Sequence, residues 1–149
     1  VSKANIRLEV LDPKEEKILE SDSQIAYTGT WYQVTDQGAR EGNYLESSAT
    51  ALFIYTLAKA INKGYIGNEY IEPTQKAFDG MVKTFTRLEE DGSYTITNCC
   101  AVAGLGGDSK RYRDGSFEYY ISEPIIENDP KSVGSFILAA IEYEKMTKK

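Results

Sequence analysis

The feature that most constrains this fold is a stretch between residues 43 and 62 that is apolar on nearly every side of a helix. One set of apolar positions recurs at helical spacing, and a second set fills most of the opposite side. The first set is Leu45, Ala49, Leu52, Phe53 and Ala60, and the second is Ala51, Ile54, Leu57, Ala58 and Ile61. A helix that is apolar all round has to be covered by other elements. The sequence therefore predicts a helix buried inside a helical core.

Polar side chains gather where this helix begins. Asn43 and Glu46 have the spacing of a capping box, so we expect the helix to start at Asn43 with Glu46 in its first turn. The two serines after Glu46 are small enough for a close helix crossing. Trp31 and Gln33 lie shortly upstream. We therefore expect a pocket at the mouth of the helical core, beside the polar end of the buried helix.

Three further helices are expected around it. The first covers residues 12–27, where an aspartate and a proline provide a cap and a first-turn residue. The next, over residues 72–88, is amphipathic and belongs on the outside. The last begins at Asp129-Pro130, with an expected buried stripe of Val133, Phe136, Ile137, Ala140 and Ile141. Inner apolar helices thus alternate with outer amphipathic ones, as in stacked helical hairpins.

The remaining chain predicts one short extended segment and one long loop. Residues 94–97 are rich in β-branched and aromatic side chains, which suits a strand. Residues 99–128 are dense in glycine and aromatic residues and show no long periodic stretch. A loop of this length in a compact domain is usually a binding element.

Composition narrows the class of protein. The net charge is −6 and no cluster of Lys or Arg provides a basic face, which argues against nucleic acid as a partner. No apolar run is long enough to span a bilayer, so no membrane partner is expected. The chain has no His, and its only cysteines are the neighbours Cys99 and Cys100, so neither a metal, a cofactor nor a disulfide framework is expected. One domain over residues 1–149 is the expected organisation.

Several motifs then carry a family resemblance. They occupy residues 29–36, 42–49, 101–107 and 112–120, followed by Glu123-Pro124 and residues 128–131. In this order, over nearly the whole chain, they resemble the signature of the unsaturated rhamnogalacturonyl hydrolases of glycoside hydrolase family 105. That family is related to the unsaturated glucuronyl hydrolases of family 88.

The resemblance implies an all-α fold, in which this chain is part of a six-hairpin α/α toroid with long loops and a short β segment. It also implies that the chain is the C-terminal part of such an enzyme, which fits a chain that does not begin with Met. The family's catalytic aspartate and its Arg-Gly-Asn-Gly-Trp stretch lie upstream of the matched region and have no counterpart here. We therefore assign no catalytic residue. The resembling enzymes hydrate the C4–C5 double bond of a terminal unsaturated uronic acid in oligosaccharides left by polysaccharide lyases.

Because no catalytic residue is assigned, the role expected of this chain is substrate binding. The candidate residues are weighed against structural roles. Trp31 could stack on a sugar ring or fill the core. Gln33 offers a donor and an acceptor to sugar hydroxyl groups. Glu46 is a candidate contact, although its role as the capping-box partner of Asn43 is favoured.

The second group of candidates lies in the long loop. Arg113 can fork onto a carboxylate, which a uronate has and a neutral sugar lacks. Tyr112 and Asp114 flank it as further contacts, and the alternative is a surface pair of Asp114 with Arg113 or Arg111. One of the neighbours Tyr119 and Tyr120 should pack inside, and we take Tyr119 as the site candidate.

Three hypotheses follow for function. In the first, the chain supplies one wall of the pocket for an oligosaccharide with an unsaturated uronic acid and is inactive alone. In the second, it is a carbohydrate-binding or assembly module whose bare inner-helix surface forms a homo-oligomer or pairs with a complementing N-terminal chain. In the third, it is a small helical protein that has kept the motifs and lost the pocket.

Overall fold

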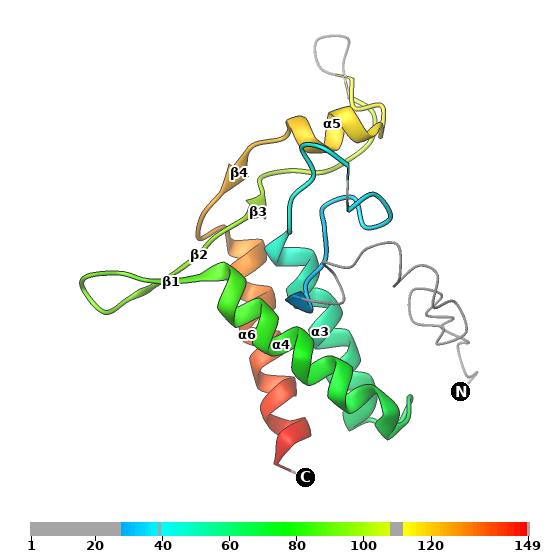
Figure 1. The fold of residues 1–149 in the computed structure, drawn as a ribbon, viewed down its shortest axis with the longest axis vertical. Helices are drawn as coiled ribbons and strands as arrows, with labels where there is room; N and C mark the ends of the chain where they lie inside the picture. The colour runs from blue at the N-terminus through cyan, green and yellow to red at the C-terminus, as the bar shows by residue number, and fades with distance from the viewer. Residues whose placement is uncertain (1–27, 39, 108–111, 149) are drawn as a thin grey trace.

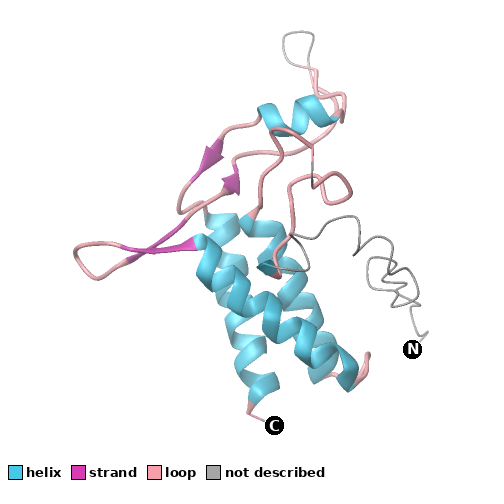
Figure 2. Ribbon diagram, viewed as in Figure 1, coloured by secondary structure: helices cyan, strands magenta, loops and turns pink. Residues whose placement is uncertain are grey.

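Three long helices and two small sheets make up the structure, a computed structural model that describes residues 28–38, 40–107 and 112–148 (Figures 1 and 2). The helices are α3 (Ser47–Asn62), the 3-10 turn η2 (Asn68–Tyr70), α4 (Ile71–Phe85), α5 (Phe117–Ser122) and α6 (Pro130–Thr147). The strands are β1 (Thr86–Leu88), β2 (Tyr94–Ile96), β3 (Cys99–Cys100) and β4 (Ile125–Ile126). The chain is therefore mostly helical with a few short strands, as the sequence predicts.

Helices α3 and α6 run side by side in the same direction, and α4 crosses them in the opposite direction (Figure 1). Their contact surfaces form one apolar core. Its buried members are Ala51, Ile54, Ala77, Met81, Phe85, Phe136 and Ala139. Trp31 and Leu45, from the segment before α3, pack against the edge of this core. The helices are thus a rigid base for the segments that precede and follow them.

Both sheets are antiparallel pairs at one end of the helices. Strands β1 and β2 form a hairpin with Thr86 opposite Ile96 and Leu88 opposite Tyr94. Strands β3 and β4 pair Cys99 with Ile126. Figure 2 shows that these strands, α5 and most of the loops lie where α3 and α6 begin and α4 ends. The molecule therefore has a helical end and a loop-bearing end.

Two backbones meet closely at α4. A Cβ atom added to Gly80 would lie 1.8 Å from the carbonyl oxygen of Thr28, and one added to Gly29 would lie 2.6 Å from that of Lys76. Only glycine allows so close an approach. The segment that leads to Trp31 is thereby held against α4.

The structure corrects two predicted boundaries. The buried helix starts at Ser47, not at Asn43, and Glu46 itself is the N-cap. The amphipathic helix stops at Phe85 rather than at residue 88, and Leu88 lies exposed in a strand. The chain leaves the helix there because Thr86 takes an extended conformation and pairs with Ile96.

The loop over residues 99–128 also contains more structure than predicted, because α5 and strands β3 and β4 lie inside it. The expected helix over residues 12–27 lies outside the described residues. In the part of the chain that the structure describes, no helix combines the length and apolar character needed to span a bilayer.

The buried face of α6 differs from the predicted stripe. Of the predicted stripe only Phe136 is buried, and most of the buried residues of α6 are small. The buried set is Ser132, Ser135, Phe136, Ala139 and Met146. Ile137 and Ile141 are 56% and 45% exposed, and Leu52 on α3 is 49% exposed. Small side chains let two helices approach closely, so they take the contact and leave the larger apolar residues outside.

Candidate functional site

The candidate site lies at the loop-bearing end, where segments before α3, after β2 and around α5 come together (Figure 1). The first segment folds back on itself through a bond from the Gln33 amide to the Tyr44 carbonyl at 2.8 Å. A bond from the Glu46 amide to the Trp31 carbonyl, at 2.9 Å, closes the same turn. Trp31, Gln33 and Glu46 are thus brought together at the start of α3, as the sequence predicts.

The loop between residues 34 and 43 is fixed from within and from outside. Asn43, the predicted helix cap, instead accepts a bond from the Val34 amide at 3.2 Å and donates to the Gln37 carbonyl at 2.9 Å. Arg40 forms an ion pair with Glu118 and places its guanidinium 3.9 Å from the centre of the Phe117 ring. This loop is therefore attached to α5.

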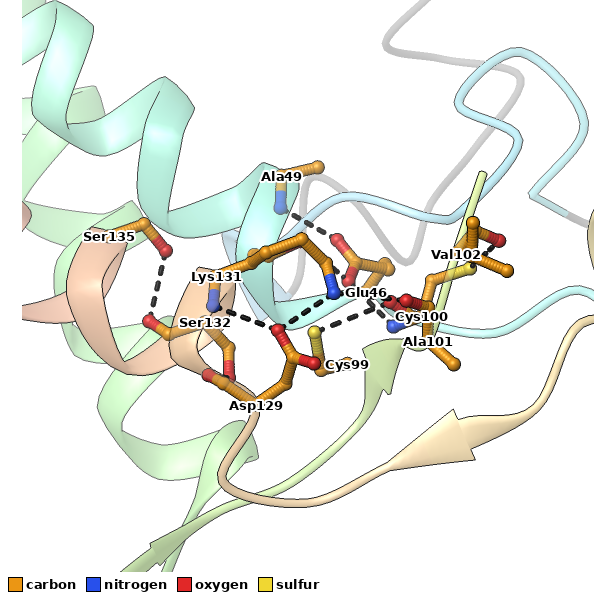
Figure 3. Close-up of polar contacts among 11 residues, drawn as sticks. Glu46, Ala49, Cys99, Cys100, Ala101, Val102, Asp129, Lys131, Ser132 and Ser135 are labelled. Carbon is orange, nitrogen blue, oxygen red and sulfur yellow. Dashed lines mark hydrogen bonds and ion pairs between the residues drawn. The ribbon is translucent and has the colours of Figure 1, made fainter. Parts of the chain in front are cut away.

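Glu46 is a buried structural carboxylate, and Figure 3 shows its partners. Its two oxygens accept bonds from the Ala49 amide at 2.6 Å, the Ser48 hydroxyl at 2.9 Å and the Cys100 amide at 3.0 Å. The first bond caps α3 and the last ties the helix to β3. The predicted capping box with Asn43 as the cap is wrong, because Glu46 itself is the N-cap of α3.

A second capped helix begins beside it (Figure 3). Asp129 accepts a bond from the Lys131 amide at 2.8 Å and pairs with the Lys131 ammonium at 2.7 Å. The hydrogen bond from the Lys131 side chain lowers the pKa of Asp129. The same ammonium donates to the Ala101 carbonyl at 3.0 Å, which ties α6 to the segment after β3. The starts of α3 and α6 are therefore both bonded to the neighbouring residues Cys100 and Ala101.

Cys100 is surrounded by polar groups from the first segment. The Gln33 side-chain amide donates to its sulfur at 3.3 Å, and the thiol donates to the Val102 carbonyl at 3.2 Å. Burial raises the pKa of the Tyr44 hydroxyl, and the neighbouring Cys100 side chain adds to the rise. Burial also raises the pKa of the Cys99 thiol. Both cysteines are free thiols, and these surroundings make them packing and hydrogen-bonding groups.

Trp31 is half-buried and serves partly as a structural residue. Its ring meets Phe53 edge-on, with 5.2 Å between ring centres, and its amide donates to the Thr50 hydroxyl at 3.1 Å. Because part of the ring remains accessible, both predicted roles, core filling and sugar stacking, remain compatible with this position.

Arg113 anchors the second half of the site. Its backbone pairs with Gly106 through two bonds of 2.8 and 2.9 Å, and its side chain lies over Gly104, where an added Cβ would be 3.9 Å from Nη1. The Arg113 Nε lies 3.8 Å from a carboxylate oxygen of Glu123. The side chain of Glu123 is fully buried, and that of Arg113 is 32% exposed. Sequence reasoning did not single out Glu123, although it falls within a matched motif.

The neighbours of Arg113 divide into exposed and buried residues. Tyr112 is 70% exposed. Asp114 accepts a bond from the Ser116 amide at 2.9 Å, and this backbone bond lowers the pKa of Asp114. Tyr119 is buried, as predicted for one of the tyrosine pair, and its hydroxyl accepts a bond from the Gly104 amide at 3.1 Å. Arg113 therefore pairs with Glu123 rather than with Asp114.

The described residues thus place the candidates in two groups. Trp31, Gln33 and Glu46 surround the start of α3, and Tyr112, Arg113, Asp114 and Tyr119 surround α5. The segment from Cys100 to Gly104 joins the two groups, and the Arg40 contacts with α5 join them a second time. Within the described ranges, no three His, Cys, Asp or Glu residues gather closely enough to hold a metal ion.

Comparison with known proteins identifies the family of this arrangement. The sequence profile described as Glycosyl Hydrolase Family 88 matches residues 21–147, which is most of the chain. The chain belongs to glycosyl hydrolase family 88. This family 88 chain also resembles a solved family 105 glycoside hydrolase from C. acetobutylicum, with 43% identity and a TM-score of 0.79. The resemblance covers 85% of the chain and 34% of that structure. The predicted family relationship is confirmed.

Curated relatives of the family 88 chain cover a similar stretch. A protein of Agrobacterium fabrum is 37% identical over an alignment of 118 residues, and the match covers 76% of this chain and 51% of the relative. A 24.9 kDa protein in the picA locus of Rhizobium radiobacter gives the same values. The chain therefore spans about half the length of these relatives and about a third of the solved hydrolase.

Proposed function

We propose that this chain forms the C-terminal part of a six-hairpin α/α toroid hydrolase that acts on unsaturated uronyl oligosaccharides. In this proposal the chain supplies substrate-binding residues from its loop-bearing end. The position of Arg113 is the main support. The backbone of Arg113 is fixed by hydrogen bonds, and its guanidinium is half-buried. It lies at the same loop-bearing end as Trp31.

The proposed contacts follow from the chemistry of the substrate. A uronate carries a carboxylate, and the planar guanidinium of Arg113 can donate two parallel hydrogen bonds to it. Trp31 and Tyr112 would contact the apolar faces of sugar rings. Gln33 would contact hydroxyl groups, provided that its amide turns away from Cys100.

The proton donor that this reaction needs is assigned to residues outside the chain. Hydration of an enol ether requires a carboxyl group that gives and then takes a proton. Both oxygens of Glu46 already accept bonds that hold α3 and β3 together. In the proposal, Glu46 therefore supports the site structurally, and the chain binds substrate without converting it.

Titration calorimetry with an unsaturated uronyl disaccharide and its saturated counterpart tests this function. We expect the chain to bind the unsaturated sugar more tightly, and Arg113→Gln to weaken binding about tenfold or more through loss of a charge-assisted contact. Absorbance of the C4–C5 double bond should stay constant in the mixture. Equal affinity for the two sugars, absence of binding, or loss of the double bond would each overturn the proposal. Glu127→Gln, on an exposed residue that pairs with Arg87, is the control.

A second candidate function, an assembly module, rests on one observation. Four large apolar residues of α3 and α6 are exposed, and they are Leu52, Ile137, Leu138 and Ile141. Apolar patches of this kind often mark contact surfaces. A second copy of the chain could pack α6 against α6 in a symmetric dimer, with each copy covering the same residues of the other.

Sedimentation velocity distinguishes the two candidates. Assembly predicts a dimer at micromolar concentration that dissociates when Ile137 and Ile141 are both replaced by Lys, because a charge cannot be buried in an apolar contact without a partner. A wild-type monomer across the concentration range would rule out assembly by this face. Replacing Asn68 and Ser93, two exposed residues outside α3 and α6, both by Lys provides a control of equal charge.

A further inference from the structure

Glu123 is a buried carboxylate that is not among the proposed substrate contacts. It follows α5 directly, precedes Pro124, and has a side chain that is fully removed from solvent. A buried carboxylate is costly unless charged or hydrogen-bonding groups compensate it. Among the residues that the structure describes, Arg113 is a cation that faces it, with Nε at 3.8 Å. The arrangement thus brings a buried negative charge behind the side chain proposed to meet the substrate.

Tyr119 completes the arrangement from α5. It lies four residues before Glu123, which directly follows the helix. Its hydroxyl accepts a bond from the Gly104 amide at 3.1 Å. Burial, together with the Glu123 carboxylate beside the hydroxyl, raises the pKa of Tyr119. The phenol therefore keeps its proton at neutral pH and remains a donor next to Glu123.

The guanidinium of Arg113 is oriented by these neighbours. Its Nε is buried and has no hydrogen-bond partner among the described residues, and it faces Glu123 at a distance longer than a direct bond. Gly104 lies beneath the side chain. With Nε directed to the interior, the outer edge formed by the two Nη groups is left for a ligand. Two parallel bonds from that edge suit a carboxylate.

Building on the function proposed above, we infer that Glu123 is a positioning residue that aims the outer edge of the Arg113 guanidinium at the carboxylate of the uronate. Orienting a long side chain before binding removes an entropy cost worth about 2- to 12-fold in affinity. This gain in affinity applies only to ligands that form hydrogen bonds with the guanidinium. A neutral ligand of the same shape gains little from it.

The test compares the unsaturated uronyl disaccharide with its methyl ester by titration calorimetry. Wild-type chain should bind the acid at least about tenfold more tightly than the ester. Glu123→Gln should weaken binding of the acid about 2- to 12-fold and leave the ester unchanged. Glu123→Asp, which keeps the charge, should retain part of the preference. Glu127→Gln removes one exposed charge four residues away and should behave as wild type.

The outcomes separate this inference from the function on which it rests. A wild-type chain without preference for the acid would overturn the proposed carboxylate contact, and the role of Glu123 with it. A wild-type preference that survives in Glu123→Gln, or that becomes stronger, would overturn the role of Glu123 alone. Equal weakening for acid and ester would indicate a merely structural residue and would also contradict it. Should Glu123→Gln not fold, Tyr119→Phe replaces it and must lower the preference for the acid.

Discussion

At the scale of single residues, buried carboxylates organise the loop-bearing end. Glu46 holds α3 to β3, and Glu123 lies behind Arg113. Sequence spacing predicted that Glu46 serves a helix start. It could not show that three donors converge on it, because one of them comes from Cys100, more than fifty residues further along the chain. Contacts between distant segments are invisible to local patterns.

Removing the Glu46 side chain should therefore be costly. Glu46→Ala should lower the free energy of unfolding by about 2–4 kcal/mol, because it deletes a helix cap and leaves buried donors unpaired. Urea denaturation followed by circular dichroism measures this change. Glu144→Ala, on an exposed residue of α6, should stay within about 0.5 kcal/mol of wild type. A cost for Glu46→Ala no larger than that of this control would contradict the anchoring role.

Asp129 predicts a pH dependence of stability. The Lys131 side-chain bond lowers the pKa of Asp129 in the folded chain, so its contribution is present above the unfolded value of about 3.9 and is lost as the pH falls below it. Asp129→Asn keeps a cap and removes the charge. The variant should have a lower free energy of unfolding than wild type near neutral pH, and this difference should disappear in acid. Urea denaturation across this pH range checks it, and a gap that is constant with pH would contradict it.

At the scale of elements, the three long helices and one extended segment could be predicted, whereas α5, the other short strands and the contact faces of the helices could not. The Asp129-Pro130 signal correctly marks the start of α6. The stripe chosen on α6 was largely wrong because α6 is apolar on more than one side. Small residues such as Ser135 and Ala139 permit the closer approach to α3. The pattern of apolar residues alone does not show which of two apolar faces of a helix packs against another helix.

Two helical glycines give a matched test of this packing. Gly80→Ala on α4 should destabilise the chain by about 1–3 kcal/mol, because the new methyl would meet the Thr28 carbonyl oxygen. Gly134→Ala on α6 meets nothing within 4 Å and should stabilise by up to about 1 kcal/mol through helix propensity. Thermal and urea denaturation of both variants measure the difference. The same sign for both would mean that the contact between residue 28 and α4 does not restrain the fold.

At the scale of the whole molecule, long helices form one end, and loops, short strands and α5 form the other. The family relationship and the grouping of Trp31, Gln33 and Glu46 could be predicted from motifs, since these residues lie close in sequence. The pairing of Arg113 with Glu123 could not, because it depends on how α5 folds back over Gly104. The chain spans about a third of the solved hydrolase that it resembles, and the proposed catalysis needs the remaining part.

The most direct test of this account is an NMR titration of the chain with an unsaturated uronyl disaccharide. The account predicts that the amide shifts change within residues 30–46, 98–107 and 112–123. The C-terminal halves of α3 and α6 should keep their shifts. Changes confined to the open face around Ile137 and Ile141, or absent altogether, would contradict a carbohydrate site at the loop-bearing end.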